Sequence, residues 1–172
     1  MTASRILVTG AELLNKGHRG FEPVVQDLVQ NARSEIQLAA YVLTSSTTEL
    51  LNLLGVAASR GVSVSIVVNR LSRQHPTVRR WLEGAPSRWR GFIVGDFAHN
   101  DRRELHAKVC VTDRSRAVVG SANFTWGGLV SNYEIGVEVE GVLAWKLGAL
   151  VDELLLMSSV VAEASDTRVE GA

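Results

Sequence analysis

Six polar side chains suited to chemistry fall within residues 105–134 of this 172-residue chain. They are His106, Lys108, Asp113, Ser121, Asn123 and Glu134. They interrupt two apolar runs, 105–112 and 117–120, which we predict to be short buried strands joined by a turn at 113–115. Because alternate side chains of a strand share a face, His106 and Lys108 are expected to point in the same direction.

An imidazole and an ammonium group side by side on an apolar strand indicate an anion between them, since burying them without a partner is unfavourable. The second run ends in Gly120-Ser121-Ala122-Asn123, where a hydroxyl and an amide supply neutral donors for an oxyanion. The carboxylates of Asp113 and Glu134 could orient the imidazole. This combination favours phosphoryl transfer through a histidine nucleophile.

The spacing His106-x-Lys108-x4-Asp113-x6-Gly120-Ser121-x-Asn123 resembles the signature of the phospholipase D superfamily at every defined position. The sequence Asn-Tyr-Glu-Ile-Gly-Val at 132–137 extends the likeness. The resemblance covers residues 20–157 and implies a phospholipase D-like α/β catalytic domain with a mixed, largely parallel β-sheet flanked by helices. Residues 1–19 are interpreted as an N-terminal extension with a short strand and one helical turn, and residues 158–172 as a flexible C-terminal tail.

The resemblance implies that His106 attacks the phosphorus of a phosphodiester and forms a phosphohistidine, which water then opens, with no metal or other cofactor required. Three side chains would bind the non-bridging oxygens: Lys108, Ser121 and Asn123. Glu134 is predicted to accept a hydrogen bond from the other ring nitrogen of His106. For Asp113, which stands at a turn, both an architectural and a catalytic role remain open.

Such a mechanism needs a second histidine to protonate the leaving oxygen. The chain has one copy of the motif, and the other histidines do not start a second: His18, His75 and His99 are followed two positions later by Gly20, Thr77 and Asp101. Two-copy members of the superfamily are internal pseudo-dimers. We therefore expect this chain to be one half-unit that pairs as a homodimer, with both His106 residues on the two-fold axis.

The charges are unevenly distributed although the formal net charge is zero. Residues 60–116 contain twelve Lys and Arg against five Asp and Glu, and the remainder contains six against thirteen. Candidate nucleic-acid contacts are Arg70, Arg73, Arg79, Arg80, His99 and Arg103, with Trp81 and Trp89 available for stacking on bases. The alternative is a solvated helix over 77–83 with one tryptophan in the core, and an exposed loop histidine.

Two further features of the sequence bear on the cellular compartment of the protein. The single cysteine, Cys110, falls in a predicted buried strand and favours a core residue in a reducing compartment. No stretch approaches the roughly 18 apolar residues of a membrane span, so we expect a cytoplasmic protein without membrane association.

A closing helix over 142–157 is predicted to bury one apolar stripe: Leu143, Leu147, Leu150, Val151, Leu154 and Leu155.

The leading hypothesis is a metal-independent phosphodiesterase, a nuclease of DNA or RNA that belongs to a restriction or phage-defence system. One alternative is a phospholipase or phosphatidyltransferase using the same site, and another is a non-catalytic nucleic-acid-binding subunit of a larger complex. The basic central third favours nucleic acid over lipid, because no exposed amphipathic or polybasic membrane surface is evident. The intact motif favours an enzyme over a binding subunit.

Overall fold

The computed structural model describes residues 4–98 and 103–161. Its strands are β1 (Ser4–Val8), β2 (Arg19–Gly20), β3 (Glu35–Ala40), β4 (Ser63–Asn69), β5 (Phe92–Phe97), β6 (Val109–Thr112), β7 (Arg116–Gly120), β8 (Ile135–Glu140) and β9 (Ser159–Val160). Its α-helices are α1 (Ala11–Leu14), α2 (Phe21–Asn31), α3 (Thr48–Ser59), α4 (Pro76–Arg88) and α5 (Val142–Leu156). Three short turns complete the list: η1 (Ser45–Thr47), η2 (Leu71–Arg73) and the π-helical η3 (Gly127–Ser131).

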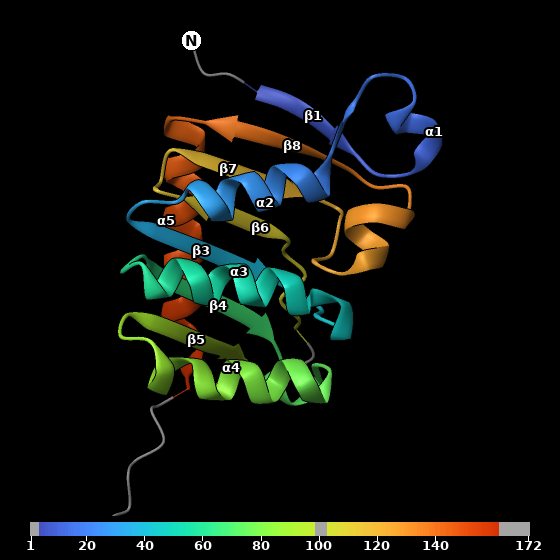
Figure 1. Cartoon of the computed structure of the whole chain (residues 1–172). Helices are drawn as coiled ribbons and strands as arrows, with labels where there is room; N and C mark the ends of the chain where they lie inside the picture. The colour runs from blue at the N-terminus through green and yellow to red at the C-terminus, as the bar shows by residue number, and fades with distance from the viewer. Residues whose placement is uncertain (1–3, 99–102, 162–172) are drawn as a thin grey trace, which may run out of the picture.

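All the described strands join one sheet in the order β2-β1-β8-β7-β6-β3-β4-β5-β9. Helices α2, α3 and α4 cover one face of this sheet, and α5 crosses the other face (Figure 1). Helix α2 buries the apolar positions that recur at the helical period, among them Val24, Leu28 and Val29. The α/β class and the mixed sheet flanked by helices are therefore confirmed.

The prediction of a largely parallel sheet is wrong. Within the described residues, β1–β2, β3–β4 and β4–β5 are parallel, whereas five pairs are antiparallel: β1–β8, β3–β6, β5–β9, β6–β7 and β7–β8. The physical reason is the connection length in the second half of the chain. A three-residue turn links β6 to β7, and so short a connection can join only antiparallel neighbours.

Two glycines allow α2 to approach the sheet closely. A Cβ on Gly120 would lie 2.7 Å from the Cα of Gly136 on the next strand and 2.9 Å from the ring of Phe21. The ring of Phe21 therefore fills the space that two side chains would otherwise occupy. The glycine of the motif thus packs the first turn of α2 against the strand that leads into Ser121.

Helix α5 differs from its predicted packing. Its buried residues are the small or β-branched Ala144, Gly148 and Val151, because the helix lies close to the sheet and Gly148 meets the side chain of Gln37. The predicted core residues Leu143 and Leu150 are 51% and 54% exposed. A row of apolar side chains consequently remains on the outer surface of α5.

Both ends of the described chain belong to the sheet. Strand β1 pairs with β8 over five residues, from Ser4 opposite Val139 to Val8 opposite Ile135, and β9 pairs with β5. The predicted strand and helical turn within residues 1–19 are present as β1 and α1. Of the predicted tail, residues 162–172 lie outside the described part of the chain.

Asp113 fastens the β6–β7 turn to the start of β3. Its carboxylate accepts hydrogen bonds from the backbone N–H groups of Arg33, Ser34 and Glu35 and from the Ser34 hydroxyl, at 2.7–3.1 Å. Asp113 and Arg114 both adopt positive φ, as the two central residues of a type I′ turn do. Burial alone would raise the pKa of Asp113, but these hydrogen bonds outweigh it and hold the pKa below the ordinary value of 3.8.

Replacing Asp113 with Asn is expected to lower the free energy of unfolding at pH 7 by about 1–3 kcal/mol, because a charged acceptor of several hydrogen bonds is lost. A carboxyl group with a depressed pKa stabilises the fold above its unfolded pKa and loses this contribution as the pH falls through its folded pKa. The difference between the two proteins in chemical denaturation should therefore shrink below about pH 4. The control E83Q, which removes an exposed ion pair of 3.7 Å between Arg79 and Glu83, should stay near wild type. A pH-independent difference would contradict this role.

Candidate active site

The motif begins on a short irregular segment rather than on a strand. The predicted strand from Leu105 starts only at Val109, because the partner strand β3 ends at Ala40. The backbone N–H of Leu105 donates instead to the Oδ1 atom of Asn69, at 3.0 Å, and Asn69 is buried at the end of β4. The segment that carries His106 is thus fixed by the carboxyl ends of the parallel strands.

The side chains of His106 and Lys108 lie together, as expected. The Nζ atom of Lys108 is 2.9 Å from Nδ1 of His106 and 3.3 Å from its Nε2, and it donates to the carbonyl oxygen of His106 at 2.7 Å. The ring of Tyr41 packs on the imidazole with 4.3 Å between centroids. Lys108 Nζ also lies 5.1 Å from the centroid of the Tyr41 ring, within the range of a cation–π contact.

Lys108 is a buried cation whose positive charge is only weakly offset by neighbouring groups. The residue is only 6% exposed, whereas His106 beside it is open to solvent. Burial lowers the pKa of Lys108, and the negative charge of Glu134 opposes this effect. An anion that reaches the exposed side of His106 would therefore find a poorly solvated ammonium group ready to pair with it.

Glu134 lies against Ser121 rather than in a hydrogen bond with His106. Its carboxylate accepts a hydrogen bond from the Ser121 hydroxyl and another from the Nδ2 group of Asn132. Its backbone N–H donates to the Oγ1 atom of Thr9, at 3.1 Å. In the single chain, Glu134 thus influences the site through Ser121 and through its charge near Lys108.

Asn123 sits at the start of the segment that leads into η3. Gly128 packs so tightly on its backbone that a Cβ there would overlap the Asn123 carbonyl oxygen. The Oδ1 atom of Asn123 is buried and has no hydrogen-bond partner among the described residues. Its amide is therefore held in place by packing, with hydrogen-bonding capacity left unused.

Asp113 is distant from these groups. It follows β6, whereas His106 precedes that strand, and four strand residues span about 13 Å. The structure brings together His106, Lys108, Ser121, Asn123 and Glu134 at one edge of the sheet and leaves Asp113 at the other.

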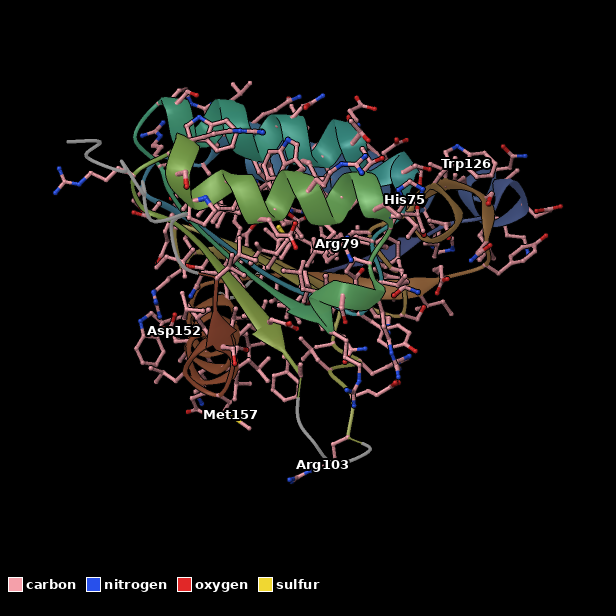
Figure 2. All side chains as sticks on the ribbon, turned by 90° about the horizontal axis from the view of Figure 1, so that it is seen from below. His75, Arg79, Arg103, Trp126, Asp152 and Met157 are labelled. Carbon is pink, nitrogen blue, oxygen red and sulfur yellow. The ribbon has the colours of Figure 1, made fainter. Side chains whose placement is uncertain are left out.

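The arginines proposed as nucleic-acid contacts have varied surroundings. Arg73 lies 3.5 Å from Glu104 and Arg79 lies 3.7 Å from Glu83, while Arg80 is exposed on α4. Arg70 follows β4, where its N–H donates to the carbonyl of Phe97. Arg103 lies on the side of the sheet that carries α5 (Figure 2). His99 falls outside the described residues.

The two tryptophans of this region form a packed cluster. Trp81 and Trp89 lie 5.4 Å apart between ring centroids, and both pack on Phe92. Trp89 also donates to the Ser59 hydroxyl at 3.0 Å. Both rings are partly buried against the helical face, so the packed cluster contains both tryptophans rather than the one that the structural interpretation expected.

A family model described as cardiolipin synthase, phospholipase D-like domain, matches residues 25–153. The chain belongs to the phospholipase D superfamily. A curated relative, the DISARM protein DrmC of Bacillus paralicheniformis, is 29% identical over 124 residues, which are 69% of this chain and 49% of the relative. The chain thus spans about half the length of that relative.

Two solved structures share the fold. The phospholipase D family member Nuc from Salmonella typhimurium superposes with a TM-score of 0.73 at 19% identity, over 93% of this chain and 98% of Nuc. NucT from Helicobacter pylori gives a TM-score of 0.73 at 17% identity, over 92% of this chain and 98% of NucT. These likenesses show that the phospholipase D-like half-unit is a fold found in solved proteins of nearly the same length.

In the part of the chain that the structure describes, no helix is long and apolar enough to cross a membrane. Within the same residues, no three His, Cys, Asp or Glu side chains are grouped so that they could hold a metal ion.

Several residues of this phospholipase D-like site were not recognised from the sequence. Tyr41 contacts both His106 and Lys108, and Gln74 ties the end of β3 to β4 through hydrogen bonds to the carbonyls of Tyr41 and Asn69. Their only signal in the sequence is position, since each follows directly, or within a few residues, the carboxyl end of a predicted parallel strand.

Tyr41 is expected to hold the imidazole in its reactive orientation. Y41F keeps the ring under His106 and Lys108 and should retain kcat within about threefold, whereas Y41L should lower kcat by roughly ten- to a hundredfold because a misplaced nucleophile loses most of its advantage. Steady-state hydrolysis of bis(p-nitrophenyl) phosphate would measure this effect. Thermal unfolding of each variant would check the fold, and equal kcat values for the leucine and phenylalanine variants would rule the role out.

Proposed function

We propose that this chain is a metal-independent phosphodiesterase, and specifically a nuclease that cleaves DNA or RNA through a phosphohistidine intermediate. The observation that carries this proposal is the 2.9 Å contact between a ring nitrogen of the exposed His106 and the buried ammonium group of Lys108. A ring nitrogen that accepts a hydrogen bond from Lys108 is unprotonated and carries the lone pair that a nucleophile requires.

The first step follows from this geometry. An incoming phosphodiester draws the Lys108 ammonium group from the imidazole to a non-bridging oxygen, which frees the ring nitrogen to attack phosphorus. The new P–N bond forms as the P–O bond to the leaving group breaks. Asn123 donates to a non-bridging oxygen, and the Ser121 hydroxyl does so after it turns from Glu134. Water then attacks phosphorus, the P–N bond breaks and regenerates His106, and the group that protonated the leaving oxygen takes the proton of the water.

Glu134 and Asp113 have different proposed roles. Glu134 acts electrostatically, because its carboxylate orients the Ser121 hydroxyl and helps to keep Lys108 charged. Asp113 acts architecturally, because its carboxylate is occupied by the backbone amides of residues 33–35. Its contacts favour this role over the catalytic one.

The leaving oxygen needs a proton, and a second copy of the chain is the proposed source. His106 contacts Lys108 and Tyr41 in its own chain, neither of which is a second imidazole. A two-fold dimer with both His106 residues on the axis would place one histidine as nucleophile and the other as general acid. The site would then be complete only in the dimer.

The outer surface of α5 supports this pairing. A hollow of about 260 Å³ lies between α5 and the motif strand, with an almost entirely apolar lining: Ala107, Val109, Leu147, Leu150, Val151, Glu153, Leu154 and Met157. It begins next to His106, and Met157 and Arg103 lie on this same side of the sheet (Figure 2). A contiguous apolar surface beside an incomplete site is what a self-complementary interface would bury.

Nucleic acid is the proposed substrate class. The excess of Arg and Lys within residues 60–116 favours a polyanion, and Arg73 and Arg80 lie on the segment that follows β4 and on α4. The relative described as a DISARM protein supports a defence role within a larger assembly. Cleavage of phosphatidylcholine in place of oligonucleotides would instead favour the lipid-acting alternative.

Replacing His106 with Asn is expected to abolish turnover of labelled DNA and RNA oligonucleotides, a loss of at least about a thousandfold, because the nucleophile is removed. Binding of the same oligonucleotides should persist, since Lys108, Ser121 and Asn123 remain. Wild-type activity should be unchanged by EDTA. The assay is gel-resolved cleavage, and activity retained by H106N would refute the mechanism.

Replacing Leu150 with Glu is expected to convert a dimer into a monomer and to lower activity roughly a hundredfold or more, because a charge in the apolar interface is costly and the second histidine is lost. Sedimentation velocity and the cleavage assay, run on the same samples, would measure both effects. V56E places the same charge on the opposite face of the sheet, on α3, and serves as the matched control. A fully active monomer would exclude the shared site.

A further inference from the structure

A second hollow lies beside the motif, on the face that carries α2 and α3. It measures about 80 Å³ and is lined by α2, by η1 with the start of α3, and by the segment that follows Asn123. An enclosed cavity of about 150 Å³ holds benzene, so this smaller hollow admits one edge of a six-membered ring while the rest of the ring lies outside it.

The hollow is held open by hydrogen bonds between segments distant in sequence. The Oγ1 atom of Thr47 donates to the carbonyl of Phe124 at 2.8 Å, and the backbone N–H of Trp126 donates to the Ser46 hydroxyl at 2.9 Å. Thr47 also bonds the N–H of Thr44, at 3.0 Å, which closes the turn before α3. The walls are therefore pre-formed rather than dependent on a ligand.

The lining combines an aromatic wall with an acidic rim. Trp126 is 60% exposed although it lines the hollow, so its indole face is available for stacking. Val25, Leu50 and Phe124 form an apolar floor. Glu22 and Glu49 stand at the rim, and the side-chain amide of Gln26 donates to Glu49 at 3.4 Å.

We propose that this hollow binds one unstacked pyrimidine base, preferably cytosine, of the nucleic-acid strand whose phosphate is held at His106. The inference rests on the proposed nuclease function and adds a base preference to it. Stacking on Trp126 recognises the flat ring, and a carboxylate of the rim accepts a hydrogen bond from the exocyclic amino group, which thymine and uracil lack. An acidic rim repels phosphates, so it favours the base edge over the backbone.

The position of the hollow fits a neighbouring nucleotide. Trp126 follows the phosphate-binding Asn123 by three residues, which span at most about 11 Å. His75 and Trp126 lie toward the same end of the molecule in Figure 2, at the edge where the parallel strands end. A strand crossing that edge could place a phosphate at His106 and an adjacent base on Trp126.

The test measures binding of fluorescent octadeoxynucleotides to the full chain in the cleavage-deficient H106N background, with fluorescence anisotropy as the readout. The probes are oligo-dC, oligo-dT and oligo-dC with a single abasic step at each position in turn. We expect oligo-dC to bind at least about fivefold more tightly than oligo-dT, and one abasic position to lose this advantage. W126A should weaken oligo-dC binding roughly tenfold and remove the sensitivity to that abasic position.

Two further variants separate stacking from recognition of the amino group. E49Q should bring the affinities for oligo-dC and oligo-dT close together while both remain bound, because the glutamine amide no longer prefers a donor on the base. V56A removes an exposed apolar group from the same helix outside the hollow and should bind all probes like its parent. Equal losses on intact and abasic probes in W126A, or no loss at all, would overturn the proposal. If W126A lost no oligonucleotide affinity, the remaining occupant of the hollow would be an apolar side chain of a protein partner.

Failure of the base site and failure of the nuclease function give different results. If wild type cleaves no phosphodiester while the binding pattern holds, the base site stands and the proposed chemistry fails. If wild type cleaves oligonucleotides while W126A and the abasic probes show no effect, the chemistry stands and the base site is overturned.

Discussion

The structure depends most on how the ammonium group of Lys108 is buried. Only 6% of this residue is exposed. Its hydrogen bonds run to the carbonyl oxygen and the imidazole of His106, and neither group carries a negative charge. Burial lowers the pKa of Lys108, and an anion that pairs with the ammonium group would stabilise its charged form. The surrounding fold maintains this arrangement, which favours an anion beside His106.

The fold holds the strand β6, which follows His106, at both of its ends. At the site, Asn69 and Gln74 fix the segment that carries the motif to the carboxyl ends of the parallel strands, and Tyr41 packs beneath both reactive groups. At the opposite end, Asp113 fastens the hairpin of β6 and β7 to β3. These two attachments fix the strand between them, so the positions of His106 and Lys108 follow from its length and twist.

Local patterns in the sequence predicted what is local in the fold. Alternation placed His106 and Lys108 on one side of the chain, and apolar patterns located β6, β7 and α5. The contacts that complete the site join residues far apart in sequence, such as Tyr41 with His106 or Thr9 with Glu134, and no periodicity reports them. The exposure of Leu150 was missed for a related reason, because an apolar helix face reads the same whether it packs on its own sheet or on a second molecule.

We propose that one chain contains half of an active site. Co-expressing wild type with H106N at known ratios and measuring oligonucleotide cleavage by the purified mixtures tests it most directly. If each site needs both histidines, activity falls with the square of the wild-type fraction, so an equal mixture retains about a quarter of full activity. A linear decrease, with about half of the activity in the equal mixture, would contradict the shared site.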